Sequence, residues 1–178
     1  MTAYGLAVLD ALQVLHTSWC DQMMVCITSL GNAGAVWIVF AVVLLLRRRT
    51  RAIGIYCILA LLLSFLCCNL ILKPLLMRPR PFLFSDVELL VAAPHDYSFP
   101  SGHAASSFSA ATAISACGKR MAIAAYALAA GIAFSRLYLY LHFPGDVAAG
   151  VLLGICCGLL ARRLGKNFAI CKEDNQHR

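Results

Sequence analysis

Long apolar runs separated by short clusters of arginine and lysine constrain this 178-residue chain more than any other feature of its sequence. A helix needs about 17 to 25 mostly apolar residues to cross the hydrocarbon core of a bilayer. Stretches that reach or approach this length cover residues 30–46, 52–72, 101–117, 121–141 and 147–160. The chain is 61% hydrophobic and only 13% charged, unlike a typical soluble domain. The pattern predicts a single all-α domain over residues 1–178, built as a polytopic membrane helix bundle.

The stretch 4–30 is less apolar than the five later runs. It carries several polar side chains within its hydrophobic sequence, namely Asp10, Gln13, His16, Asp21 and Gln22. Such a segment can cross the membrane, lie along the interface as an amphipathic helix, or form a re-entrant pair. We therefore expect an N-terminal helix that is interfacial or spanning, and five to six transmembrane helices in total.

The basic clusters predict how the bundle is oriented. Short cytoplasmic loops are enriched in lysine and arginine. With five alternating spans, the clusters at 47–51, 119–120 and 162–166 all fall on one side, which is assigned as cytoplasmic together with a polar tail at about 167–178. The outer side then receives residues 73–100 and the link 142–146. Five prolines in 73–100 predict an irregular outer segment with short helical pieces.

The net charge of +7 and the nine cysteines each suggest a function that the sequence does not otherwise support. A nucleic-acid binder needs a soluble basic surface, whereas here the positive charges gather at the ends of apolar runs. The cysteines form no CxxC pair and no zinc-like spacing with histidine, and most lie inside apolar runs. We expect them to act as small packing residues, and we expect no nucleic-acid partner.

Three polar motifs lie at the predicted outer ends of the apolar runs. They read Lys73, six residues, Arg80-Pro81; then Pro100-Ser101-Gly102-His103; then Ser135-Arg136, five residues, His142, three residues, Asp146. In this order and at these spacings, they resemble the three-part signature of the type 2 phosphatidic acid phosphatase superfamily, with no departure at the motif positions. The signature covers residues 73–146, and the superfamily includes lipid phosphate phosphatases.

The phosphate-binding residues expected from this resemblance also suit the chemistry. Phosphoryl transfer is catalysed largely by positioning and by stabilising negative charge on the phosphate oxygens. Lys73, Arg80 and Arg136 supply positive charge. Ser101 and Gly102 lie at a predicted helix N-terminus, where free N–H groups attract anions, although Ser101 can equally be a helix cap. Arg78 lies outside the signature and is expected to be an interfacial side chain.

The resemblance assigns the catalytic steps to two histidines and a carboxylate. It implies that His142 is the nucleophile, forming a phosphohistidine, that His103 is the general acid, and that Asp146 holds the second ring nitrogen of His142. Two histidines and a carboxylate could instead bind a metal ion. Three converging cations would repel a divalent ion, so we expect no metal and no other cofactor.

The function predicted by these residues is that of a membrane phosphatase acting at the outer face. Length and the stretch Thr28-Ser-Leu-Gly-Asn32 resemble small bacterial members, which favours undecaprenyl diphosphate as the lipid substrate. Phosphatidylglycerophosphate or phosphatidate is the alternative. A membrane transporter is a remote alternative, because no inverted repeat is visible. Asp86, Glu88 and Asp96 make the outer segment locally acidic, which can restrain the choice of substrate, but we expect them to belong to a solvated loop.

Overall fold

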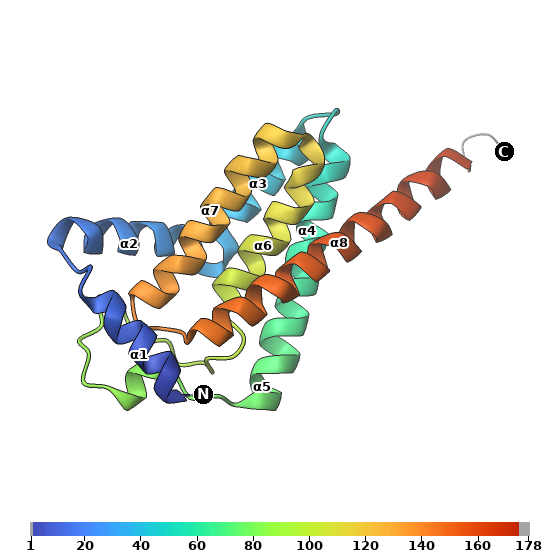
Figure 1. Cartoon of the computed structure of the whole chain (residues 1–178). Coiled ribbons are helices and arrows are strands. Elements are labelled where there is room, and N and C mark those ends of the chain that lie inside the picture. Colours follow the sequence, from blue (N-terminus) through green and yellow to red (C-terminus); the bar gives the residue numbers. More distant parts are fainter. Residues whose placement is uncertain (1, 175–178) are drawn as a thin grey trace.

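A computed structural model describes residues 2–174, and the side chains of residues 3–166. Every regular element in this part of the chain is a helix. The main helices are α1 (Thr2–Gln13), α2 (Ser18–Leu30), α3 (Ala35–Leu46), α4 (Arg51–Phe65), α6 (Gly102–Ile114), α7 (Lys119–Tyr138) and α8 (Pro144–Asp174). Figure 1 shows α3, α4, α6 and α7 running side by side, while α2 lies across their direction. The prediction of an all-helical membrane bundle is confirmed.

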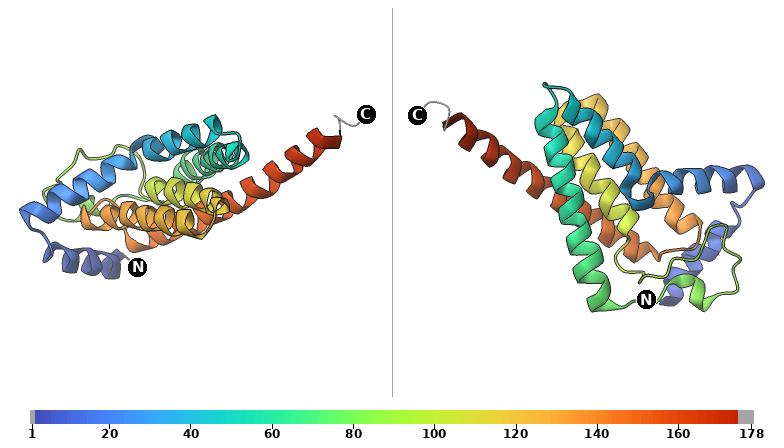
Figure 2. Two further views of the ribbon diagram at one scale, coloured as in Figure 1. Left: turned by 90° about the horizontal axis from the view of Figure 1, so that it is seen from above. Right: turned by 180° about the vertical axis from the view of Figure 1, so that it is seen from behind.

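Shorter helical pieces connect these elements. They are η1 (Asn32–Gly34), the π-helix η2 (Leu66–Leu72), α5 (Lys73–Leu76), η3 (Pro81–Phe84) and η4 (Ser115–Cys117). The view from behind in Figure 2 shows α4 continuing without a break toward α5. The segment that follows α5 is irregular apart from η3, because its prolines do not allow a continuous helix.

Fewer helices are long and apolar enough to span a membrane than the sequence suggested. Within the residues that the structure describes, three meet this description: Arg51–Phe84, Lys119–Tyr138 and Pro144–Lys166. A fourth is possible if Ser18–Leu30 and Asn32–Leu46 are taken as one span, bent by 48°. The bend lies at η1, where Ala33 has a φ of 51° and Gly34 a φ of 70°, both in the left-handed region. The expected run 30–46 therefore includes a break, and α3 begins only at Ala35.

The expected span at 101–117 is a short helix buried among its neighbours. Helix α6 has 13 residues, and at 1.5 Å per residue it rises about 20 Å, less than the hydrocarbon thickness. It packs against α4, α7 and α8. Its sequence is rich in alanine and serine, which lets neighbouring backbones approach closely. Gly150, Gly154 and Gly158 of α8 face it, with no room for a side chain.

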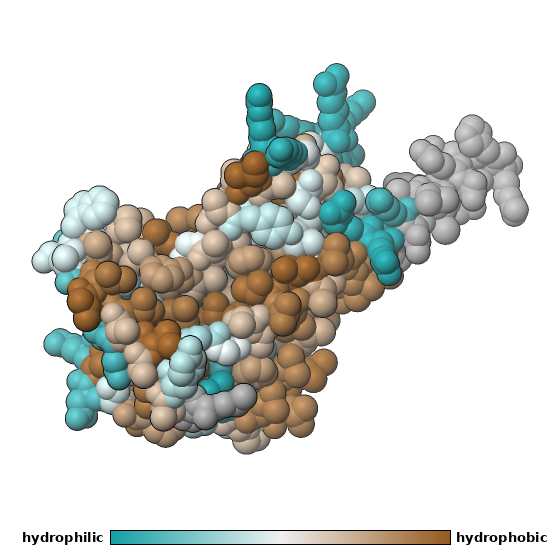
Figure 3. Space-filling view, in the orientation of Figure 1, coloured by the Kyte–Doolittle hydropathy of each residue, from teal (hydrophilic) through white to brown (hydrophobic). Residues whose placement is uncertain are grey.

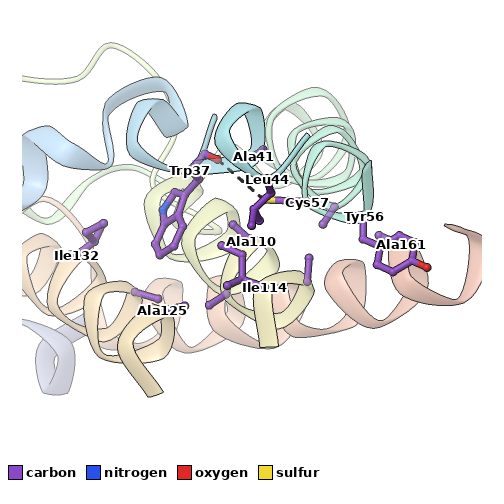
Figure 4. Close-up of a cluster of buried hydrophobic side chains, with 14 residues drawn as sticks. Trp37, Ala41, Leu44, Tyr56, Cys57, Ala110, Ile114, Ala125, Ile132 and Ala161 are labelled. Atoms are coloured by element: carbon purple, nitrogen blue, oxygen red, sulfur yellow. Dashed lines mark hydrogen bonds between the residues drawn. The ribbon is translucent and has the colours of Figure 1, made fainter. Parts of the chain in front are cut away.

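The hydrophobic core joins α3, α4, α6, α7 and α8, as Figure 4 shows. Trp37 is 1% exposed and donates a hydrogen bond of 2.9 Å from its indole nitrogen to the hydroxyl of Ser107 on α6. Small residues such as Ala41, Ala60 and Ala110 fill the space between the helices. The core therefore fixes α6 relative to α3 and α4, and so fixes the residues at the start of α6.

The surface has the pattern expected of a membrane protein. Figure 3 shows hydrophobic residues in a band across the visible face of the bundle, with hydrophilic residues above it. In Figure 1, the α3–α4 and α6–α7 connections lie at that upper end, and the irregular segment lies at the lower end. The predicted polar tail begins as a continuation of α8, which runs to Asp174, and residues 175–178 lie outside the described residues.

Candidate active site

The three signature motifs come together at one end of the bundle. Six of the eight predicted site residues line a single cavity of about 820 Å³: Lys73, Arg80, Gly102, His103, Arg136 and His142. The other two, Ser101 and Asp146, are fully buried next to it. The backbone N–H of Ser101 donates to the carbonyl of Asp146 at 3.0 Å, which joins the second motif to the third. Helix ends separated widely in sequence thus form one site.

The cations come from three different elements and are all nearly inaccessible to solvent. Lys73 follows directly after the π-helix η2, a type of distortion that is frequent at functional sites. Arg80 precedes the proline that starts η3, and its NH1 donates to the carbonyl of Leu141 at 2.8 Å. Arg136 lies in the last turn of α7 and donates from NH1 to the hydroxyl of Thr28 at 2.8 Å. Its buried Nε has no partner among the described residues and is free to donate to a ligand.

The link between α7 and α8 presents His142 to the cavity. Tyr140 has a φ of 58°, and the N–H of Leu141 donates to the carbonyl of Arg136, so the chain turns sharply after α7. On one side, Nε2 of His142 lies 3.3 Å from NH1 of Arg80. On the other side, Nδ1 lies 3.4 Å from the hydroxyl of Ser98 and 3.8 Å from a carboxylate oxygen of Asp146. Nε2 is therefore the ring nitrogen on the side of the cations.

The carboxylate of Asp146 is held by several donors. It accepts a hydrogen bond of 2.5 Å from the hydroxyl of Ser98, one of 3.0 Å from the N–H of Phe143, and one of 2.6 Å from Arg78. The 3.8 Å separation from His142 exceeds hydrogen-bond distance, so Ser98 bridges the two side chains. Burial lowers the pKa of His142; the negative charge of Asp146 opposes this, and the positive charge of Arg80 reinforces it. The imidazole is thus neutral at neutral pH and can act as a nucleophile.

His103 projects from the first turn of α6 into the same cavity. Its Nε2 lies 3.1 Å from the amide oxygen of Asn32, in the break between α2 and α3. Gly31 packs against the ring so closely that an added Cβ would be 2.7 Å from Cδ2 of His103. Ser101 caps α6 by accepting from the N–H of Ala104 at 3.5 Å. The structure thus shows the capping contact of Ser101 and places His103 opposite η1.

Asp96 was expected to belong to a solvated loop, but in the structure it contacts two cations of the site. Its two carboxylate oxygens contact Lys73 and Arg80, the latter at 2.5 Å from NH2, and its backbone carbonyl accepts from Nε of Arg80 at 2.8 Å. Burial by itself would raise the pKa of this carboxyl, but the hydrogen bonds and charges of Lys73 and Arg80 outweigh it and lower the pKa to about 2. Asp96 is therefore a charged member of the site.

Comparisons with known proteins agree with this geometry. The sequence profile of the PAP2 superfamily matches residues 54–169, well over half of the chain. The chain belongs to the PAP2 superfamily. An undecaprenyl-diphosphatase of Sulfolobus acidocaldarius is 37% identical over 154 residues, covering 85% of this chain and 74% of that protein. This PAP2 protein is accordingly an integral membrane enzyme that hydrolyses phosphoric esters or anhydrides of lipids.

Two solved PAP2 structures have the same fold. The crystal structure of Aquifex aeolicus LpxE is 30% identical, with a TM-score of 0.78, and the match covers 89% of this chain and 94% of that one. A transmembrane PAP2 type phosphatidylglycerolphosphate phosphatase from Bacillus subtilis is 25% identical, with a TM-score of 0.77, and the match covers 93% of this chain and 86% of that one. The helical arrangement in Figure 1 is therefore that of PAP2 membrane phosphatases.

Several residues of this PAP2 site were missed by sequence reasoning. Arg78 was expected to be an interfacial side chain, yet it pairs with the buried Asp146 and its guanidinium lies 4.3 Å from the ring centre of Phe143. Ser98, Thr28 and Asn32 were not predicted as site residues. Thr28 and Asn32 lie before the region matched by the PAP2 profile. The stretch Thr28-Ser-Leu-Gly-Asn32 resembles small bacterial members, and that resemblance is the signal that could have pointed to these two residues.

The cavity also has an apolar half. Away from the cations it is lined by Ile38 of α3 and by Ile58, Leu61, Leu62 and Phe65 of α4. Leu62 and Phe65 remain more than half exposed on the surface of the bundle. A lipid tail is matched by such side chains, while its phosphate is matched by the polar end.

Among residues 3–166, no three histidine, cysteine or acidic side chains are grouped as metal ligands.

Proposed function

We propose that this PAP2 enzyme removes the terminal phosphate of undecaprenyl diphosphate through a phosphohistidine intermediate and without a metal ion. The observation that carries the proposal is the position of Nε2 of His142, which faces a cavity with Lys73, Arg80 and Arg136 at one end and an apolar lining at the other. A phosphate held by the cations lies next to the nucleophile, and its hydrocarbon chain can remain in the membrane.

In the first step, the lone pair of His142 Nε2 attacks the terminal phosphorus. A new N–P bond forms while the bond from phosphorus to the bridging oxygen breaks. His103 donates a proton to that oxygen, and undecaprenyl monophosphate leaves. Lys73, Arg80 and Arg136 stabilise the negative charge on the transferring phosphoryl group. Such electrostatic stabilisation is usually the largest contribution to the rate enhancement. Asp146, through Ser98, keeps the proton of His142 on Nδ1.

In the second step, a water molecule attacks the phosphohistidine. His103 now takes a proton from the water, the N–P bond breaks, and inorganic phosphate is released. His142 returns to its neutral form, and the cycle is balanced without a further reactant. Within the described part of the chain, the buried Nε of Arg136 has no partner. This supports the phosphate-binding role of Arg136, because a buried donor left without an acceptor is costly and a phosphate oxygen would satisfy it.

Undecaprenyl diphosphate is preferred as substrate because the Sulfolobus relative is an undecaprenyl-diphosphatase. Phosphatidylglycerophosphate is the second candidate, favoured by the similarity to the Bacillus subtilis structure. The site residues suit both lipids, since each presents a phosphate at the membrane surface on an apolar chain.

We propose that the chain acts as a single domain over residues 1–178.

We also propose a topology of five spans, formed by α3, α4 to α5, α6, α7 and α8, with α1 and α2 at the interface. Three basic clusters then lie on the cytoplasmic side, at the α3–α4 loop, at the start of α7, and at 162–166 in α8. The active site lies on the outer face, and the C-terminus is cytoplasmic. The shortness of α6 is accommodated because its neighbours bury most of its surface.

The experiment that tests the reaction uses enzyme purified in detergent and a lipid diphosphate labelled at its terminal phosphate. His142→Ala should abolish turnover and leave no acid-labile phosphoenzyme. His103→Ala should slow turnover yet still form phosphoenzyme, since it retains the nucleophile. A chelator should leave the rate unchanged. Turnover by His142→Ala would contradict the mechanism.

A substrate panel tests the choice of lipid. It contains undecaprenyl diphosphate, phosphatidylglycerophosphate, phosphatidate and a short isoprenyl diphosphate. We expect the highest kcat/KM for undecaprenyl diphosphate. Equal values for all four lipids would defeat the assignment of a dedicated carrier-lipid enzyme, while leaving the phosphatase chemistry intact.

A further inference from the structure

Asp96 occupies the position between two of the three cations of the site. One carboxylate oxygen contacts Nζ of Lys73, and the other lies 2.5 Å from NH2 of Arg80. The same guanidinium approaches Nε2 of His142 with its other terminal nitrogen, NH1, at 3.3 Å. Asp96 thus binds two cations with two oxygens, as a phosphate would, directly beside the nucleophile.

The two cations are buried, whereas the carboxylate that contacts them is half exposed. The side chains of Lys73 and Arg80 are 7% and 4% exposed, whereas that of Asp96 is 52% exposed. Buried cations without a counter-charge are costly, so an empty site gains stability from a nearby carboxylate. Asp96 lies in the irregular part of the outer segment and is half exposed, so its side chain can turn outward without unfolding a helix.

A phosphate bound for attack needs the same donors. If it lies next to Nε2 of His142, it must accept hydrogen bonds from Arg80 and Lys73, and its charge would repel a carboxylate at the same place. The low pKa of Asp96 means that this carboxylate stays ionised at neutral pH. In the empty site it is therefore an anion that competes with phosphate for the two cations.

We propose that Asp96 is a built-in competitor of phosphate, which fills the cation site in the empty enzyme and is displaced by the substrate. This inference rests on the phosphate-binding role proposed above for Lys73 and Arg80. Asp96 then acts as a specificity-determining residue. A diphosphate, with more negative charge, displaces it more readily than a monophosphate, and its return after hydrolysis favours release of inorganic phosphate.

The test measures binding of inorganic phosphate to the detergent-purified full chain by calorimetry. Asp96→Asn removes the competing charge and should raise the affinity about tenfold or more, equivalent to roughly 1.4 kcal/mol. Asp96→Ser, which is smaller and also neutral, should change the affinity in the same direction. The matched control is Asp86→Asn, which removes the same charge from an exposed position of the same segment and should leave the affinity unchanged.

An anchoring role for Asp96 predicts the opposite result. If Asp96 served only to order Lys73 and Arg80, both substitutions would weaken phosphate binding. Affinity that is weakened, or unchanged as in the Asp86 control, overturns the proposal. Binding of inorganic phosphate does not depend on which lipid is hydrolysed. Failure of the lipid panel with tighter phosphate binding would therefore reject the proposed substrate and support the role of Asp96.

Discussion

At the scale of single residues, the site depends on partners that hold the groups proposed to be catalytic. Asp146 is completely buried, and a buried carboxylate is stable only when it is paired and hydrogen-bonded. Arg78, Ser98 and the N–H of Phe143 provide those bonds. In the same way, Asn32 contacts His103 and Thr28 contacts Arg136. These neighbours set the orientation of the groups proposed to carry out the reaction.

Replacing Asn32 tests this positioning. Asn32→Ala removes the hydrogen bond to Nε2 of His103, so we expect kcat to fall roughly tenfold to a hundredfold, the usual effect of a misplaced catalytic group. KM should stay nearly constant, because the phosphate-binding cations are untouched. Asn32→Asp, which keeps an oxygen at the same place, should restore part of the rate. Steady-state kinetics on a lipid diphosphate provide both constants.

Ser29→Ala is the control for this prediction. Ser29 also lines the cavity, but its hydroxyl donates to the carbonyl of Val25 within α2 and touches neither histidine. Its kinetic constants should match those of the wild type. A loss of kcat as large in Ser29→Ala as in Asn32→Ala would show that the segment matters only for local folding.

The lowered pKa of His142 predicts the pH dependence of the first step. An imidazole is nucleophilic when neutral, that is, above its pKa. Because burial lowers this pKa, protonation should remove the nucleophile only well below the ordinary imidazole value of about 6.5. The rate of phosphoenzyme formation, measured by rapid acid quench, should therefore persist into mildly acidic solution. If the rate of phosphoenzyme formation instead falls to half at a pH at or above the ordinary imidazole pKa, the inference of a neutral, buried His142 is contradicted.

At the scale of elements, the contact between α6 and α8 positions the two ends of the site. The N-terminus of α6 carries His103, and the N-terminus of α8 carries Asp146. The glycines of α8 let the two helices approach with backbones almost in contact. A Cβ on Gly154 would lie 2.5 Å from the carbonyl oxygen of Ala105 and 2.9 Å from the N–H nitrogen of Ser109. Neither backbone atom can move without moving α6.

Gly154→Ala should therefore force α6 and α8 apart. We expect a loss of about 1–3 kcal/mol in stability, as for other overpacked cores, with a lower kcat. Gly131→Ala is the matched control, since the nearest atom to its Cβ would be Cγ2 of Ile27 at 3.8 Å. It should be neutral, or stabilising by up to about 1 kcal/mol, because alanine favours helix. Thermal unfolding in detergent compares the two variants, and equal midpoints would refute the packing argument.

At the scale of the whole molecule, the α3–α4 and α6–α7 connections, which hold two of the basic clusters, lie at the opposite end of the bundle from the start of α6 and the end of α7, which hold His103 and Arg136 (Figure 1). This separation underlies the proposed orientation, with the site outside and the C-terminus inside. Fusion proteins in a bacterial host test it. A fluorescent protein that folds only in the cytoplasm should be bright when fused after the C-terminus and dark when fused after Asp86. Alkaline phosphatase, active only outside, should give the reverse, and the opposite pattern would overturn the topology.

Much of the molecule could be predicted from the order of its residues. The membrane class, the all-helical fold and the family were predicted correctly, and the predicted helices at 121–141 and 147–160 overlap α7 and α8. The length of the helices was predicted less well, because fewer of the described helices are long and apolar enough to span a membrane than the sequence suggested. Hydropathy does not register the left-handed residues Ala33 and Gly34, which break one apolar run, or the end of α6 after 13 residues. Backbone conformation at such points depends on packing as well as on composition.

The sequence by itself determined which side chains the site could use, because the chemistry of phosphate transfer requires cations, imidazoles and a carboxylate, and their spacing is local to each motif. Only the tertiary structure decided which residues hold them. Asn32 and His103 are 71 positions apart, and Arg78 and Asp146 are 68 apart. Asp96 likewise meets Lys73 and Arg80 only because the irregular outer segment folds back over the cavity. Such contacts depend on how helix ends meet in space, and no periodicity along the chain encodes that.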